Sequence, residues 1–335
     1  MATRAVLLSA DVLGVITDLQ RGLPELLRPA ATYLCRVQQY RQHSYAIRSA
    51  LPAPADFPLD LDTAASLHKR RPDMFTAEVL DHLAATNVVA VVTYLLSVGA
   101  TCSVWALDEA SERGHEGMVR LLHAVGNAGC TTHAMDYAAA NGHLNIVQFL
   151  HQHRTEGCSL FAMTGAIMHG HLHVVRYLNT HRREGYNPRA MDLAAAKGYL
   201  DVITYVHNHR REGCTRDALT SAAKHGHASI VALLDQHRDE GCVNEAFVAA
   251  AGQGHLEVVR YLWATHAAQL GAFVRTARNA AETGNHEAVV GFLAVVSSSS
   301  LEQGVFGSLF QRLVGAMDMG LFIVDVAFNK ELGIF

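Results

Sequence analysis

An eight-residue stretch, HQHRTEGC at 151–158, contains the side-chain types that metal sites and thiol enzymes use. Histidine nitrogens and cysteine thiolates are the common protein ligands of zinc. A cysteine close to a histidine can also act as a nucleophile with its base. The residue types alone therefore leave three interpretations open: a zinc site, an activated thiol, or a purely structural element.

The chain repeats this pattern every 28 residues, as NTHRREGY at 179–186, HNHRREGC at 207–214 and DQHRDEGC at 235–242. A period of this size indicates a stacked repeat architecture. Counted from the residue after each Gly-Cys pair, five units have the same length, and a longer sixth unit begins at Val243; the five are 103–130, 131–158, 159–186, 187–214 and 215–242. Looser copies flank them, at about 75–102, 273–300 and 308–335.

Each unit predicts two helices joined by a tight turn. The first position is Ser, Thr or Asn, the residue types whose side chains cap a starting helix, and Pro188 suits a first helical residue. Alanines then predict a closely packed first helix, which a glycine such as Gly142 ends. The second helix carries an apolar stripe at helical spacing, as in LNIVQFL at 144–150. One such pair cannot bury its own apolar side, so neighbouring units must stack.

The stretches AAANGHLNIVQFL, AAAKGYLDVITYV and AAGQGHLEVVRYL resemble the helix-turn-helix of ankyrin repeats. The resemblance covers 75–335, with the best units at 103–270. It implies an all-α ankyrin-type helix-turn-helix solenoid of about seven or eight repeats, preceded by a small helical N-terminal region. The short, His-rich version is similar to arrays in oomycete, amoebal and giant-virus proteins.

Two departures from the ankyrin pattern change the expectation. The units have 28 residues where ankyrin repeats usually have about 33. The Thr-Pro-Leu-His start is replaced by sequences such as His133-Ala-Met-Asp136. We therefore expect short turns between repeats in place of full β-hairpin fingers.

The repetition decides how the histidines and cysteines are interpreted. Equivalent cysteines in neighbouring repeats should lie about 10 Å apart, too far to share an ion, and Tyr186 replaces one of them. We predict structural cysteines, no metal, no cofactor and no catalytic residue. His153 and its equivalents should bond the last carbonyls of the second helix. Arg154 and Glu156, with their equivalents, should form solvated surface pairs. The histidines after the turn glycines, such as His143, should make a repeated turn contact.

By the same resemblance, the varied positions of the first helix line the inner, concave face, where ankyrin arrays recognise proteins. The sequence predicts a non-catalytic protein–protein interaction scaffold that acts as a monomer. The partner-binding residues predicted on this face are Tyr137, Asn141, Met168, His169, Lys197, Lys224, His225 and Gln253.

The first 74 residues lack the repeat. Residues 1–50 predict helices that either cap the first repeat or resemble an F-box, and 51–74 predict a proline-containing linker. The F-box resemblance depends on Leu8, Val12, Ile16, Leu19, Leu27-Arg28-Pro29 and Leu34-Cys35-Arg36. It implies an alternative function, a substrate-recognition adaptor of a cullin-type ubiquitin ligase.

Composition excludes several other classes. The net charge is −4 and the basic residues are scattered, which argues against nucleic-acid binding. The sequence contains no apolar stretch long enough to cross a bilayer and no recognisable signal peptide. Six cysteines without an export signal indicate reduced thiols. We expect an intracellular protein, in the cytoplasm or the nucleus, with protein partners and no membrane or nucleic-acid partner.

Overall fold

The computed structural model describes residues 23–41, 59–126, 129–238 and 240–299. The predictions that concern residues 1–22, 42–58 and 300–335 lie outside these ranges, among them the first half of the F-box-like motif and the last repeat. The chain divides into two compact units, residues 1–185 and 186–335, which are described separately.

Both units consist of helices, and the part of the chain that the structure describes contains no strand. Unit 1 contains η2 (Glu25–Leu27), α3 (Arg28–Arg41), α5 (Leu61–Arg70), η4 (Pro72–Met74), α6 (Ala77–Ala85), α7 (Val89–Ser97), α8 (Val104–Glu112), α9 (Glu116–Val125), α10 (Thr132–Ala140), α11 (Leu144–His153), α12 (Leu160–Met168) and α13 (Leu172–His181). Unit 2 contains α14 (Arg189–Lys197), α15 (Leu200–His209), α16 (Asp217–Lys224), α17 (Ala228–His237), α18 (Val243–Gly252), α19 (Leu256–Leu270), η5 (Gly271–Phe273), α20 (Val274–Thr283) and α21 (Glu287–Ser299). The predicted helix pairs are confirmed.

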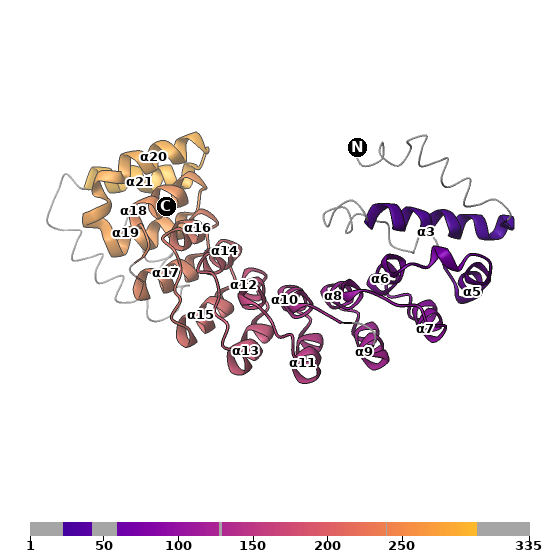
Figure 1. The fold of residues 1–335 in the computed structure, drawn as a ribbon. Coiled ribbons are helices and arrows are strands. Elements are labelled where there is room, and N and C mark those ends of the chain that lie inside the picture. The colour runs from indigo at the N-terminus through magenta and orange to yellow at the C-terminus, as the bar shows by residue number, and fades with distance from the viewer. Residues whose placement is uncertain (1–22, 42–58, 127–128, 239, 300–335) are drawn as a thin grey trace. The chain divides into compact units, whose positions relative to one another are not determined.

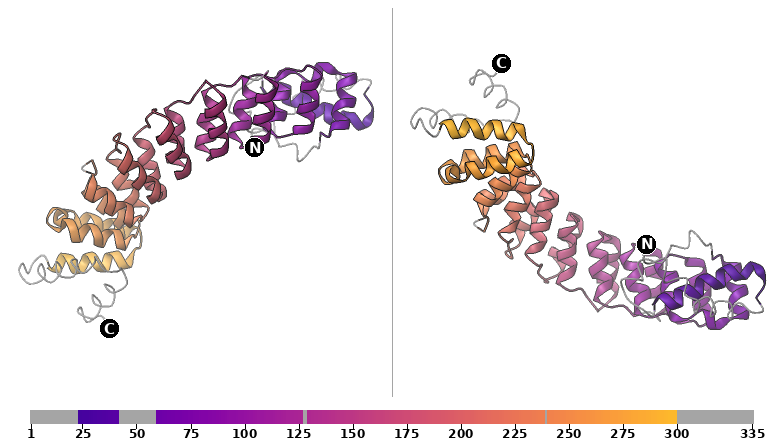
Figure 2. Two further views of the ribbon diagram at one scale, coloured as in Figure 1. Left: turned by 90° about the horizontal axis from the view of Figure 1, so that it is seen from below. Right: turned by 90° about the horizontal axis from the view of Figure 1, so that it is seen from above.

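The helices of each unit form two rows (Figure 1). In unit 1 the first helices α6, α8, α10 and α12 pack on one another, and the second helices α7, α9, α11 and α13 form the other row. Unit 2 has the same arrangement, with α14, α16, α18 and α20 in one row and α15, α17, α19 and α21 in the other. Figure 2 shows the neighbouring helices of each unit side by side from two further directions. We call the solvent-exposed side of the first row the first-helix face.

The core lies between the two rows. The alanines of α10 are buried, with Ala138 and Ala139 at 0% exposure, so the first helices approach closely. The stripe of α11 is also buried, through Ile146, Val147 and Leu150. Each such aliphatic side chain contributes about 1.5–3 kcal/mol when fully buried. This burial supplies most of the stacking energy.

The predicted caps and turns are confirmed. The hydroxyl of Thr131 accepts a hydrogen bond from the His133 N–H at 3.1 Å, and Ser159 caps α12 in the same way. Pro188 lies one residue before α14, with helical dihedrals. Gly142 ends the first helix with φ of +80°, a left-handed conformation that glycine adopts without strain.

The N-terminal helices lie against the first repeat of unit 1. Helix α3 packs on α6, and α5 packs on α7. Helix α5 falls inside the range 51–74 that we predicted as a linker, so that prediction is wrong for residues 61–70. Its residues Ala64 and Leu67 are both 0% exposed. The prolines in the same range indicate a linker, although these apolar residues have helical spacing.

The connections between repeats are short and extended. Arg154, which follows α11, has φ of −127° and ψ of 154°. No β-hairpin finger forms within the described residues, as the short repeat predicted.

A pair of hydrogen bonds joins consecutive repeats, and we call it the aspartate clasp. Asp136 on α10 accepts the Ser159 backbone N–H at 2.8 Å with one oxygen and the Ser159 hydroxyl at 2.7 Å with the other. Three further clasps have the same geometry: Asp81 with Ser103, Asp108 with Thr131, and Asp192 with Thr215. The aspartate that replaces the last residue of the Thr-Pro-Leu-His start therefore fixes the next repeat.

The clasp can be tested with Asp136→Ala. The substitution removes the acceptor of a half-buried N–H and hydroxyl, so we expect the free energy of unfolding to fall by about 1–3 kcal/mol. Urea unfolding followed by circular dichroism measures the change. Thr164→Ala is the matched control, because Thr164 occupies the same repeat position and its hydroxyl donates to the Leu160 carbonyl of its own helix. Equal losses in the two variants would contradict a role for the clasp between repeats.

Candidate functional site

The histidines that suggested chemistry lie at the end of the second helices. The Nδ1 of His153 bonds the Phe149 carbonyl at 2.9 Å, and its ring stacks on Phe149 with centroids 4.4 Å apart. His181 on Tyr177 and His209 on Tyr205 repeat both contacts. The predicted bonds to terminal carbonyls are confirmed. Because each imidazole already makes these contacts, these histidines act as caps at the ends of the second helices.

The other histidine of the motif lies between repeats. The ring of His151 is 5.7 Å from that of His181 and 5.9 Å from that of Tyr177. Burial, followed by the charges of Arg182 and His181, lowers the pKa of His151, while Glu184 raises it less. At the equivalent position in unit 2, His207 lies 5.3 Å from His237, and its pKa is also lowered, first by burial.

The cysteines are half-buried thiols. Burial raises the pKa of Cys130, Cys158 and Cys214 to about 11. Such thiols are protonated at neutral pH, whereas a nucleophile or a zinc ligand must be a thiolate. Among the described residues, no three His, Cys, Asp or Glu side chains converge on a point where a metal ion could bind. At the position of the missing cysteine, Tyr186 is buried and its hydroxyl donates to the Gly213 carbonyl at 2.9 Å.

The Arg–Glu pairs are formed, but the prediction of solvated surface pairs is wrong for the arginines. Arg154 pairs with Glu156 at 3.2 Å, yet its side chain is only 15% exposed, and Arg182 is 22% exposed. Arg182 lies against Gly157 of the preceding repeat, where an added Cβ would be 2.6 Å from its guanidinium. The arginine side chain thus packs between two repeats. The spacing of charged residues in the sequence does not indicate this burial.

The histidines after the turn glycines also connect repeats, as predicted. The Nε2 of His143 donates to the Glu112 carbonyl of the preceding repeat at 3.2 Å, and His227 reaches the Ala196 carbonyl at 3.0 Å. An added Cβ on Gly198 would be 2.6 Å from the His227 ring. Glycine is therefore required there by its left-handed backbone and by the imidazole above it.

The predicted partner-binding residues lie on the first-helix face. In unit 1, Asn141 and His169 are exposed, while Tyr137 and Met168 are half-buried. In unit 2, the exposed residues are Lys197, Lys224, His225 and Gln253. Asn141 also bonds the preceding repeat, because its side-chain amide donates to the Glu112 carbonyl at 2.8 Å. Within each unit the residues share one face across successive repeats.

Sequence reasoning missed an aromatic strip on the same face of unit 1. It consists of Trp105, His133, Tyr137 and Phe161. The ring centroids are 6.2 Å apart between Trp105 and His133, 5.6 Å between His133 and Tyr137, and 5.5 Å between Tyr137 and Phe161. The available signal was the third repeat position, which is Trp, His and Phe in three consecutive units.

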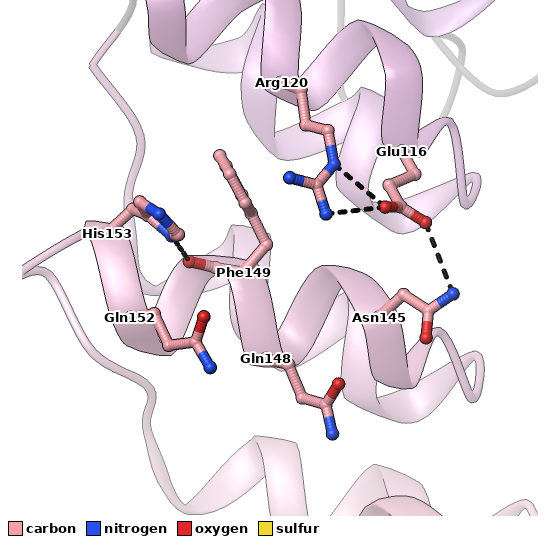
Figure 3. Close-up of a pocket in the computed structure, with 7 residues that line it drawn as sticks. All are labelled: Glu116, Arg120, Asn145, Gln148, Phe149, Gln152 and His153. Carbon is pink, nitrogen blue, oxygen red and sulfur yellow. Dashed lines mark hydrogen bonds and ion pairs between the residues drawn. The ribbon is translucent and has the colours of Figure 1, made fainter.

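A small hollow lies on the other row of unit 1, between α9 and α11 (Figure 3). Its volume is about 160 Å³. Glu116 bonds Arg120 at 2.9 Å and Asn145 at 3.3 Å, and the Arg120 guanidinium lies 4.7 Å from the centre of the Phe149 ring. Since its charged groups pair with each other, the hollow offers little charge to a ligand.

The fold and these contacts define a helical repeat protein whose repeated side chains hold neighbouring repeats together. Residues 135–217 match the family model Ankyrin repeats (3 copies), and residues 107–151 match Ankyrin repeats (many copies). The chain is an ankyrin repeat protein. No curated protein sequence matches it. Among the described residues, no helix has the length and apolar composition needed to cross a membrane.

The raised thiol pKa values can be tested by alkylation. At pH 8 we expect Cys130, Cys158 and Cys214 to react with iodoacetamide on the order of 100-fold more slowly than the same cysteines in urea-unfolded chain, whose thiol pKa is near 8.5. Mass spectrometry of peptides measures each rate. A folded-state rate equal to the unfolded one would contradict the raised pKa values, and a faster one would support an activated thiol.

The lowered pKa of His151 predicts an acid sensitivity. The unfolded chain takes up a proton near pH 6.5, before folded His151 does, so stability is present above pH 6.5 and is lost as the pH falls through the folded pKa. We expect His151→Asn, which copies Asn179 in the next repeat, to reduce the difference in unfolding free energy between pH 7.5 and pH 5.5. His225→Asn, at an exposed position, is the control. An unchanged pH dependence for His151→Asn would contradict the assignment.

Proposed function

We propose that this ankyrin repeat protein is a non-catalytic interaction scaffold that binds partner proteins through its first-helix face. The observation that carries the proposal is the division of labour among repeat positions. The residue types that recur form caps, clasps and inter-repeat contacts, whereas the residues at exposed first-helix positions vary from repeat to repeat. Variation at exposed positions on a rigid frame is what partner recognition requires.

The chemistry of the recurring residues supports the non-catalytic part of the proposal. A catalytic group needs one unique set of partners. His153 and His209 instead have matching contacts in their own repeats. The half-buried thiols have raised pKa values, the opposite of what an activated nucleophile needs.

The composition of the first-helix face supports a protein as the partner. Tyr137, Met168 and His169 provide aromatic, thioether and imidazole groups in unit 1, and aromatic and Met side chains are enriched at protein interfaces. Lys197 and Lys224 provide charge in unit 2, which gives specificity and a faster association rate. We propose that the chain acts as an intracellular monomer in this role.

The N-terminal helices favour a cap over the ubiquitin-ligase adaptor alternative. Leu34 and Cys35 of the F-box-like motif are at most 1% exposed. The Tyr33 hydroxyl also lies 2.6 Å from His82 Nε2 on α6. Side chains used in this way cannot at the same time dock an adaptor. We propose that α3 and α5 cover the apolar end of the first repeat, as repeat arrays require.

The double variant Lys197→Glu/Lys224→Glu tests the scaffold. Both side chains are exposed, so the fold should persist while the face reverses charge. We expect partners captured from native lysate, quantified by mass spectrometry, to decrease about tenfold. Arg211→Glu, at an exposed position in the connection after α15, is the control. Undiminished capture by the double variant would show that unit 2 does not bind through this face.

A further inference from the structure

The aromatic strip on unit 1 presents apolar and π surface to solvent. Phe161 is 42% exposed and the adjacent Leu160 is 56% exposed. Trp105 and Tyr137 are half-buried. The strip crosses three repeats, a distance of about 16–20 Å at normal helix spacing. An extended segment of about six residues has this length.

The strip lies on acidic helices. The four first helices of unit 1, α6, α8, α10 and α12, contain no lysine or arginine. They contain six carboxylates, of which Glu78 is exposed and Glu112 is half-buried, while Asp81, Asp108, Glu109 and Asp136 are buried. The nearest arginine in sequence, Arg113, follows the end of α8, about 12 Å along the axis from Trp105.

The corresponding helices of unit 2 have a different charge. Helices α14, α16 and α20 carry Arg189, Lys197, Lys224, Arg275 and Arg278. The acidic, aromatic character is therefore a property of unit 1 and not of the repeat. The stacking contacts described above do not involve Trp105 or Phe161, because the core positions of their helices are filled by other apolar residues, such as Leu107 on α8 and Ile167 on α12.

The face of an aromatic ring attracts a cation, and arginine is the commonest partner. The negative charge of Glu78 and Glu112 at the surface of the same row adds to this attraction and repels phosphate groups. The exposed Leu160 and Phe161 also favour apolar side chains beside the cations.

We propose that the aromatic strip of unit 1 binds an extended basic segment of a partner protein, in which arginine or lysine alternates with apolar residues. This inference rests on the proposed scaffold function and specifies the chemistry of one of its partners. Arginine side chains lie over the rings of Trp105, Tyr137 and Phe161, and apolar side chains contact Leu160. The exposed Glu78 on α6 and the half-buried Glu112 on α8 supply the complementary charge.

The test uses the full chain with Trp263→Phe, which leaves Trp105 as its one tryptophan of the two in the sequence. The probes are synthetic ten-residue peptides in which leucine alternates with arginine, lysine or glutamate. Titration at pH 7.5 follows Trp105 fluorescence and gives each Kd. We expect the arginine peptide to bind most tightly, the glutamate peptide to bind at least on the order of tenfold more weakly, and the affinity to fall with added salt.

Phe161→Lys should weaken the arginine peptide at least about tenfold, because it removes a ring and adds a repelling charge. Leu193→Lys is the matched control: Leu193 has the same 42% exposure, lies on the first helix α14 of unit 2, and gains the same charge. Thermal unfolding checks that both variants fold. Equal effects of the two substitutions, equal binding of the arginine and glutamate peptides, or no peptide binding would each overturn the inference. The scaffold itself would still stand if partner capture depended on Lys197 and Lys224, so the two failures are distinguishable.

Discussion

None of the helix pairs that the structure describes can bury its own apolar stripe, and the arrangement of the repeats follows from that constraint. Val147 on α11 reaches 0% exposure because neighbouring helices cover it. Burial has no direction, so stacking alone would allow repeats to slide or rotate. The polar contacts between repeats fix how each repeat is placed against the next. The clasp from Asp136 to Ser159 fixes the first helix of the next repeat, and His143 fixes its turn. Apolar contact thus holds the repeats together, while hydrogen bonds to the backbone set their register.

The helix pairs, their caps and their turn glycines were predictable because their signals are local and recur. The contacts between repeats were less predictable, since they join residues 22 to 31 positions apart. In the sequence, Asp136 is only a departure from the ankyrin start, because its acceptor role for Ser159 depends on how the two repeats pack. The burial of Arg154 was missed for the same reason, because charge type indicates a surface while packing decides exposure. Helix α5 was missed because prolines precede it.

The candidate site was likewise predictable only in part. The side-chain identities of the first-helix face were readable, and the exposed residues Asn141, His169 and Lys197 lie where the helical period placed them. The aromatic strip was not predictable in this way. It joins residues at the third and seventh positions of the repeat, which lie in separate columns when the repeats are written one below another. A ring at one position meets a ring at another only after the helices have docked. A surface of this kind forms across several repeats, so no single repeat reveals it.

The aspartate clasp gives the array a direction with an evolutionary consequence. The repeats 103–130 and 131–158 each contribute an acceptor to the repeat after them, through Asp108 and Asp136, and each receive one from the repeat before them, at Ser103 and Thr131. Thr76 at the start of α6 occupies the receiving position of the first repeat, and its buried hydroxyl has no hydrogen-bond partner among the described residues. A duplicate of either of these two repeats carries both halves of the pair. The array can therefore gain or lose such a repeat without a change in its neighbours, and exposed first-helix surface accumulates one repeat at a time.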